Sequence, residues 1–278
     1  MNTRRRVAAV VAAMATAVTG TALVPSQVDA AAKIPRIKAS MSDNAIHLSR
    51  DTVRAGRVKF SVVAGSGDHV MQIFQLHKGY TKAEFTRDMS RVFRGRVHAI
   101  RRVDRNVSWL GGAEARKNHP GRFAVTLTAG TYYVLDQNGP AVTKLTVTGA
   151  VQPRAWIHND STIVGTGHDR FRAPKAIPHD GWTVFKDTSD EPHFLVMQHV
   201  KRGTTRHMVT RYFKSGQQGE PSFALPESSS SGIISGGSQM LFHYNLPPGR
   251  YVLLCWWPSD ETGMPHAMMG MYRMINLR

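Results

Sequence analysis

The most informative stretch of the chain is residues 248–277, PGRYVLLCWWPSDETGMPHAMMGMYRMINL. A Pro-Gly turn signal precedes the apolar run 251–254, which ends at Cys255, and a second run from Met271 reaches Leu277. Short apolar runs that are bounded by turn residues are typical of buried strands. We therefore expect two closing strands of a β-sheet, joined by a loop that carries His266, with a thiol, an imidazole and a thioether at one end.

The same order of elements occurs twice along the chain, in residues 45–149 and again in residues 176–278. We expect strands at 57–63, 70–76, 123–127, 131–135 and 143–147 in the first copy, and at 182–185, 193–200, 240–244, 251–254 and 271–277 in the second. Each copy has one helix signal. Thr81 and Glu84 form a capping box ahead of the first, and Gly203-Thr204-Thr205 opens the second.

The two copies can be aligned on their closing turns and on their helix starts. Superposing the closing glycines, 130 and 249, places Asp136 opposite Cys255, and superposing the helix starts brings His69 near His193. A mainly β fold of two tandem Greek-key β-sandwiches, each with one short helix, explains this pattern most simply. Residues 31–44 and 150–175 are then linkers, and 215–239 is a loop found only in the second copy.

The first thirty residues have the pattern of a secretory signal peptide. Three arginines at 4–6 precede an apolar run over 7–18, and small residues at 28 and 30 suit cleavage. The run is shorter than the roughly 20 apolar residues of a membrane helix. The chain's one cysteine, Cys255, is far from this segment, so no lipid anchor is expected there. We expect a secreted or cell-envelope protein without a transmembrane segment in its mature form.

The composition indicates a folded and strongly basic protein. Hydrophobic residues make up 41% of 278 residues, and the net charge is +17, or +15 once residues 1–30 are removed. A charge of this size favours an acidic partner protein or an anionic cell-envelope polymer. The densest basic stretch, 94–102, has no interleaved aromatic residues for base stacking. No specific nucleic-acid binding is therefore expected.

A single cysteine in an exported protein cannot form an internal disulfide, and an exposed thiol would oxidise. Cys255 is therefore buried and inert, paired between chains, or held by a metal. His193 at the start of one strand, Cys255 at the end of another, and His266 and Met271 beyond it supply two imidazoles, a thiolate and a thioether. Two His and one Cys with a weak axial Met form the blue-copper electron-transfer site.

At these residues the second copy resembles the cupredoxin superfamily, the plastocyanin and azurin group, in its secreted bacterial form. The resemblance lies in Pro-His at 192–193, in Pro-Gly-x-Tyr-x-x-x-Cys at 248–255, and in Pro-His-x-x-x-x-Met at 265–271. It implies a type 1 copper site with His193, Cys255 and His266 as ligands and Met271 as the axial ligand. The first copy has Asp136 in place of the cysteine, so the resemblance implies a cupredoxin-like domain without copper ligands.

The expected function is copper binding with single-electron transfer to an acidic redox partner at the exposed edge of His266. Two alternatives remain open: a metal-free, basic binding module in the cell envelope, and a Cu(I) chaperone or storage protein in which Met268 and Met269 are secondary ligands. Zinc on the same Cys and His residues is also possible. Equally, Cys255 could be a core hydrophobe and His266 a surface residue. The chain has no His-x-His pair and no hydrolase or phosphate-binding motif, so we expect no enzyme.

Overall fold

The computed structural model describes residues 33–153, 155–167, 170–216 and 219–278. The expected signal peptide, residues 1–30, lies outside the described residues. Strands dominate the described part of the chain, so the expected mainly β fold class is confirmed. No helix among these residues is both long enough and apolar enough to cross a membrane.

The elements of the first half are built from alternating buried and exposed residues, as in β3, where Val53, Val58, Phe60 and Val62 face the core. In chain order they are β1 (Arg36–Ser42), β2 (Ala45–Leu48), β3 (Thr52–Ala64), β4 (Asp68–Leu76), α1 (Lys82–Val92), α2 (Val97–Asn106), β5 (Val107–Arg116), β6 (Gly121–Leu127), β7 (Gly130–Asp136) and β8 (Val142–Gln152).

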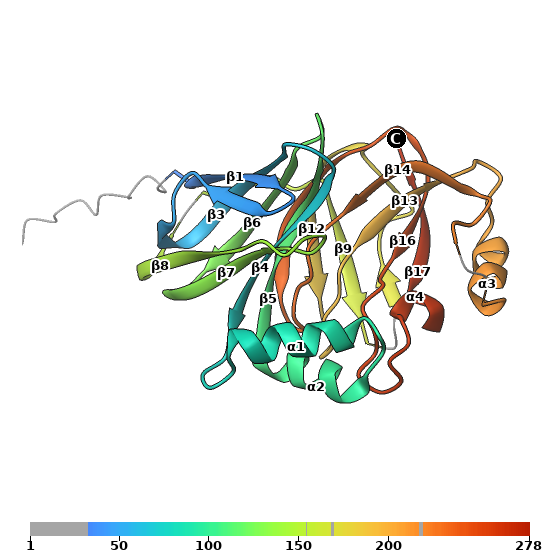
Figure 1. The fold of residues 1–278 in the computed structure, drawn as a ribbon. Helices are drawn as coiled ribbons and strands as arrows, with labels where there is room; N and C mark the ends of the chain where they lie inside the picture. Colours follow the sequence, from blue (N-terminus) through green and yellow to red (C-terminus); the bar gives the residue numbers. More distant parts are fainter. Residues whose placement is uncertain (1–32, 154, 168–169, 217–218) are drawn as a thin grey trace, which may run out of the picture. The chain divides into compact units, whose positions relative to one another are not determined.

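The second half also consists mainly of strands, with two further short helices (Figure 1). Its elements are β9 (Ser161–Thr166), β10 (Arg170–Arg172), β11 (Ala176–Ile177), β12 (Asp180–Asp187), β13 (Val196–Val200), α3 (Arg206–Lys214), β14 (Ala224–Ser230), β15 (Gln239–Asn245), β16 (Gly249–Leu254), α4 (His266–Met269) and β17 (Tyr272–Leu277). Of these strands, β12 shows the same alternation, and β16 ends in a continuous buried run.

Strand pairing repeats between the two halves. The parallel pair β1–β3 has its counterpart in β9–β12, and the antiparallel pairs β3–β6, β4–β7 and β7–β8 have theirs in β12–β15, β13–β16 and β16–β17. A second feature is shared: the hydroxyl of Tyr132 donates to the Thr128 carbonyl, and that of Tyr251 donates to the Pro247 carbonyl, four residues upstream in each case. The repeat seen in the sequence is therefore a repeat of strand order and of local contacts.

A direct strand pair joins the two halves. β15 pairs antiparallel with β6, with Phe242 opposite Phe123, so that a single sheet runs from β10 to β5. The contacts group residues 31–278 as one unit. The buried amide of Gln72 strengthens this junction, because it accepts a hydrogen bond from the Ile233 backbone N–H and donates to the Ile233 carbonyl. The segment at 231–235 thus lies between the halves.

The helix starts agree with the sequence, but the number of helices does not. Thr81 accepts a hydrogen bond from the Glu84 N–H and the Glu84 carboxylate accepts one from the Thr81 N–H, which confirms the capping box of α1. Thr205 caps α3 in the same way, through Met208 N–H. The expectation of one short helix in each half was wrong, because α2 follows α1 and α4 follows the Cys255 loop.

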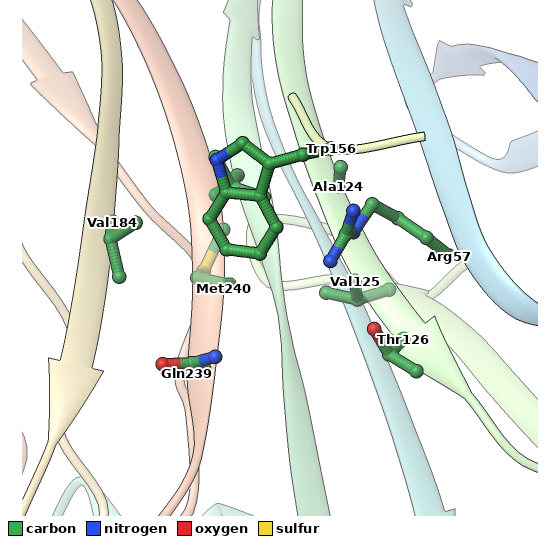
Figure 2. Close-up of a pocket in the computed structure, with 9 residues that line it drawn as sticks. Arg57, Ala124, Val125, Thr126, Trp156, Val184, Gln239 and Met240 are labelled. Atoms are coloured by element: carbon green, nitrogen blue, oxygen red, sulfur yellow. The ribbon is translucent and has the colours of Figure 1, made fainter. Parts of the chain in front are cut away.

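The two segments that we expected to be linkers carry strands. Residues 31–44 include β1, which pairs with β3. Residues 150–175 include β9, which pairs with β12, and β10, which pairs with β9. β1 alternates fully, with Ile37, Ala39 and Met41 buried, so its pattern was present in the sequence and was missed, whereas β10 has only three residues. Between β8 and β9, Trp156 lies over the seam of β6 and β15 beside Arg57, whose guanidinium is 4.5 Å from the ring centroid (Figure 2).

Candidate metal centre

Three side chains from the second half converge at one buried point. Cys255 Sγ lies 3.8 Å from His193 Nδ1 and 3.7 Å from His266 Nδ1, and the two Nδ1 atoms are 3.0 Å apart. All three residues are buried, with exposed fractions of 0 to 1%. They form the cluster of potential metal ligands found among the described residues.

Strand pairing places two of these side chains. Cys255 follows β16 directly, and His193 stands just before β13, whose Val196 pairs with Leu254. The backbone of His193 is held on its other side, because it exchanges both hydrogen bonds with Ile234. Ile234 also bridges to Leu110 of β5, so a strand of the first half supports the position of His193.

The loop between Cys255 and His266 is closed by its own backbone. Pro258 bridges Pro265 at the base of this loop, and the His266 N–H donates to the Trp257 carbonyl at 2.9 Å. The Ala267 N–H donates to the Cys255 carbonyl at 2.7 Å, which brings the start of α4 against the end of β16. The ten-residue loop therefore brings the His266 imidazole back beside the Cys255 thiol.

The outer nitrogen of each imidazole has a hydrogen-bond partner that fixes its tautomer. His266 Nε2 lies 2.8 Å from Glu191 Oε2, which as a carboxylate can only accept, so Nε2 carries the proton. His193 Nε2 lies 3.1 Å from Ser189 Oγ, and that hydroxyl donates its own proton to Asp187 Oδ1 at 2.7 Å. His193 Nε2 therefore donates as well.

In these tautomers the Nδ1 atoms of His193 and His266 carry no proton, so their lone pairs face each other and the Cys255 thiol. Burial, with a smaller contribution from His266, lowers the pKa of His193 to about 3, so this ring stays neutral. Burial raises the pKa of Asp187, which lies behind Ser189, to about 6. Two lone pairs at 3.0 Å without a proton between them repel each other, and a cation between them removes that repulsion.

The donor set fits a type 1 copper site. Metal bonds of about 2.0 Å to imidazole and about 2.3 Å to thiolate place the donors of one ion roughly 3 to 4 Å apart, which is the spacing of these atoms. Two imidazoles and one thiolate in a buried, preformed cluster are the donors of the blue-copper centre. The outer partners of the imidazoles are those that hold metal-ligating histidines in place.

Met271 is buried close to His193. A Cβ atom built on Gly165 would lie 2.8 Å from His193 Cδ2 and 3.4 Å from Met271 Cε, so the ring and the methyl group share the space that this glycine leaves. The Met271 N–H also donates to the His266 carbonyl, at 2.9 Å. Its role as axial ligand stays a prediction.

The other two methionines lie apart from this cluster on the surface of α4. Met268 and Met269 are 37% and 39% exposed, and Met269 Sδ accepts a hydrogen bond from the Thr262 hydroxyl. Their assignment as secondary ligands is also left as a prediction. The expectation of an exposed His266 edge was wrong, because His266 is 0% exposed and Glu191 covers its outer nitrogen.

A helix pair from the first half covers this end of the site. Arg101 in α2 donates to the Asp260 carbonyl in the Cys255–His266 loop, and Gly95 packs against Gly263 of the same loop. Figure 1 shows α1 and α2 at the end of the sheets where α4 also lies. The Phe93 ring meets the Trp257 ring edge-on, with centroids 6.3 Å apart. The loop with His266 is thus enclosed by the other half.

Comparisons with known proteins give structural likenesses only. No family model matches the sequence, and no curated protein matches it. Among solved structures, the chain is similar to auracyanin A, a "blue" copper protein of Chloroflexus aurantiacus (18% identity, 41% of this chain, 98% of that chain, TM-score 0.30), and to the dithionite-reduced auracyanin of Roseiflexus castenholzii (17%, 42%, 94%, 0.27). It is also similar to the copper nitrite reductase of Nitrosomonas europaea (9%, 87%, 93%, 0.25).

Identities of 18% or less and TM-scores of 0.30 or less carry no argument about this chain. The case for the metal centre rests on the donor atoms and their surroundings. Four residues of that surrounding were not singled out from the sequence as parts of the site: Gly165, Asp187, Ser189 and Ile234. A glycine in a short strand and a serine in a turn have no motif of their own, so their role is visible only when distant segments meet.

Proposed function

We propose that this chain is an exported copper protein that passes single electrons through a type 1 site formed by His193, Cys255 and His266. The observation that supports this most directly is that the Nδ1 atoms of His193 and His266 face each other beside the Cys255 thiol, in a site without solvent exposure. Export rests on the pattern of residues 1–30. We assign the site the role of an electron carrier and no substrate turnover.

Copper held by these residues supplies reversible one-electron redox chemistry. The chain itself contributes rigidity. Backbone hydrogen bonds fix His193 to Ile234 and His266 to Trp257, so the donors have little freedom to rearrange when the charge of the ion changes. Trp257 and Trp109 are buried with ring centroids 5.7 Å apart, and they help to keep water from the site.

The test is spectroscopic and uses residues 31–278. Cu(II) is added to the wild type and to the Cys255→Ser variant, and the visible and EPR spectra of both are recorded after dialysis. We expect an intense blue band in the wild type and its loss in the variant, because the band requires the thiolate. Met271→Leu is the matched control at the same site, and it is expected to keep the band and change the reduction potential.

Three outcomes would contradict the proposal. A Cys255→Ser protein with the wild-type copper spectrum would exclude the thiolate as a ligand. Retention of copper only as Cu(I), with no reversible redox wave, would indicate copper storage or delivery. A wild type that keeps no copper after dialysis would indicate a metal-free β-sandwich that binds an anionic polymer or an acidic protein through its basic surface.

A further inference from the structure

The helix pair that covers the metal centre also carries a concentrated basic surface. Between Asp88 and Asp104 the chain has five arginines and His98 but no acidic residue. A hollow on this surface is lined by Asp88, Arg91, Arg94, Arg96, His98, Ala99 and Arg102. We call the exposed arginines 91, 94 and 96 the arginine rim.

The positive charge of the rim is not neutralised within the described part of the chain. Arg102 pairs with Glu84 and with the buried Asp88, and Arg87 also faces Asp88. In contrast, no carboxylate of the described residues forms an ion pair with any of the rim arginines, and Arg94 donates instead to the Ser90 carbonyl at 2.8 Å. The rim therefore presents three unbalanced positive charges to solvent.

An exposed aromatic residue lies within the rim. Phe93 is 65% exposed, and its ring contacts Trp257 edge-on. Trp257 is buried, stands two residues after Cys255 in the chain, and accepts the backbone hydrogen bond of His266 through its carbonyl. Phe93 therefore connects the protein surface to a residue that is joined to two of the three metal donors.

The direct route to the site is closed, because Cys255, His266 and Trp257 are each 0% exposed. We propose that the arginine rim with Phe93 is the docking surface for an acidic one-electron carrier protein, and that electrons enter and leave through Phe93 and Trp257. Like charges around an exposed aromatic ring select a partner of opposite charge and accelerate its encounter. This inference rests on the proposed function, since it assumes copper at the site.

The step balances as a single electron transfer. The reduced carrier protein would lose one electron and be oxidised, the copper held by His193, Cys255 and His266 would be reduced from Cu(II) to Cu(I), and no bond or proton would be exchanged. The chain contributes the contact surface and the two rings. Neither ring needs to be oxidised or reduced itself, because both serve as the medium between the two redox centres.

The first arm of the test measures binding without copper. The probe is an acidic plant-type [2Fe–2S] ferredoxin, and the metal-free chain is titrated with it at low and at high salt. We expect the affinity for ferredoxin to fall as salt screens the charges. We also expect the affinity of the triple variant Arg91→Ser, Arg94→Ser, Arg96→Ser to be lower than that of the wild type by roughly tenfold or more, on the scale of electrostatic steering. The matched control removes the same charge elsewhere, through Arg50→Ser, Lys117→Ser and Arg202→Ser at exposed positions.

The second arm measures the rate at which reduced ferredoxin bleaches the blue copper band. At ferredoxin concentrations that saturate binding to both the wild type and the variant, we expect Phe93→Ala to slow the bleaching about tenfold, which corresponds to about 1.4 kcal/mol in the barrier. Trp156→Ala, which removes an equally exposed ring at the β6–β15 seam, is expected to leave the bleaching rate unchanged.

The outcomes separate this inference from the proposed function. If the blue band is absent, the proposed function fails before the second arm begins, while the binding arm still reports on the rim. If the band is present but the rim and control triples bind equally, the docking surface is wrong. Equal bleaching rates in the wild type and Phe93→Ala would exclude the ring as the route. Binding to anionic vesicles in place of ferredoxin would assign the rim to a membrane surface and overturn the proposal.

Discussion

Asp136 and Cys255 occupy the same register position in the two halves. In the pair β7–β4, Tyr133 lies opposite Phe74, and Asp136 follows three residues after Tyr133. In the pair β16–β13, Val252 lies opposite Gln198, and Cys255 follows three residues after Val252. Five residues before Phe74 and Gln198 come the two histidines, His69 and His193. The first half therefore has a buried His–Asp pair where the second half has a His–Cys pair.

The first pair has the chemistry of a buried ion pair. His69 Nδ1 donates to Asp136 Oδ2 at 2.6 Å, and His69 Nε2 donates to the Ser66 carbonyl at 2.8 Å, so both ring nitrogens carry protons and the ring is a cation. Asp136 Oδ1 accepts from the backbone N–H groups of Val70 and Asn138. A buried ion pair thus occupies the position that the metal donors occupy in the second half.

The first prediction concerns this ion pair. Burial lowers the pKa of His69, but the hydrogen bond and charge of Asp136, with smaller contributions from the Ser66 carbonyl and Asp43, together outweigh burial, and the pKa is raised. The pair therefore stabilises the fold fully below the unfolded value of about 6.5, and this contribution is lost as the pH rises through the folded pKa. Asp136→Asn should lower the free energy of unfolding by roughly 3–5 kcal/mol, the cost of breaking a buried pair.

Urea unfolding between pH 5 and pH 9, with an NMR titration of His69, measures both effects. The difference between the wild type and Asp136→Asn should be largest at low pH and shrink above the folded pKa of His69. Asp43→Asn is the control, since Asp43 lies 4.0 Å from His69 Nε2 but is 78% exposed. A difference that grows with pH would show that His69 is neutral in the native state.

The second prediction tests the outer partner of His266. Glu191→Ala removes the acceptor at 2.8 Å from Nε2, so the imidazole can carry its proton on Nδ1, where the metal would bind. We expect Cu(II) affinity to fall about 10- to 100-fold in a competition titration with a chelator. Glu191→Gln keeps an acceptor oxygen and should recover part of this loss. Glu220→Ala, at an exposed position, should bind copper as the wild type does.

The third prediction tests the space beside His193. Alanine at Gly165 would place its methyl group 2.8 Å from His193 Cδ2, so the ring or the strand must move. Gly165→Ala should cost about 1–3 kcal/mol in unfolding free energy, as overpacked cores do, and shift the visible copper spectrum. Gly167→Ala, where nothing lies within 4 Å, should stay within about 0.5 kcal/mol of the wild type. Equal spectra for the two variants would mean that the site adapts freely.

Strands with strong alternation were predictable from the sequence, and so was the meeting of His193, Cys255 and His266 at one point. β3, β7 and β12 have buried residues at nearly every second position, and β16 ends in the continuous buried run 251–254. Both patterns can be recognised without knowing which strands pair. β5 was missed because its SWLGGAEAR sequence has two adjacent glycines and no clear alternation. Gly112 and Gly121 serve close packing against neighbouring backbones, which one strand alone does not reveal.

The covering of the site by the first half was not predictable for a related reason. α2 begins at Val97, and its N-cap residue Arg96 forms no side-chain capping hydrogen bond. The stretch RGRVHAIRR at 94–102 is dominated by charge, so the usual signals of a helix start are missing. The helix is nonetheless amphipathic, because Ala99, Ile100 and Val103 are buried on one face. Contacts such as that of Gly95 with Gly263 join residues far apart in the chain, and no local pattern records them.

The fourth prediction concerns Asp104, a carboxylate of α2 whose two oxygens are buried without a partner in hydrogen-bond geometry. Burial, together with repulsion from Asp260 and Glu191, raises its pKa to about 8, against an ordinary value near 3.9. The native state therefore holds a proton that the unfolded chain releases, and the stability of the fold decreases as the pH rises from about 4 to about 8.

Replacing this carboxyl with an amide removes the ionisation. Asp104→Asn should therefore be more stable than the wild type at neutral pH, with a gain that is absent near pH 4, grows up to about pH 8 and is constant above it. Thermal unfolding of the metal-free chain at four pH values measures this dependence. Asp51→Asn, at an exposed position, should show no such dependence. A gain that is already present at pH 4 would instead mean that the amide improves packing against Trp257, whose Nε1 also lacks a partner in hydrogen-bond geometry.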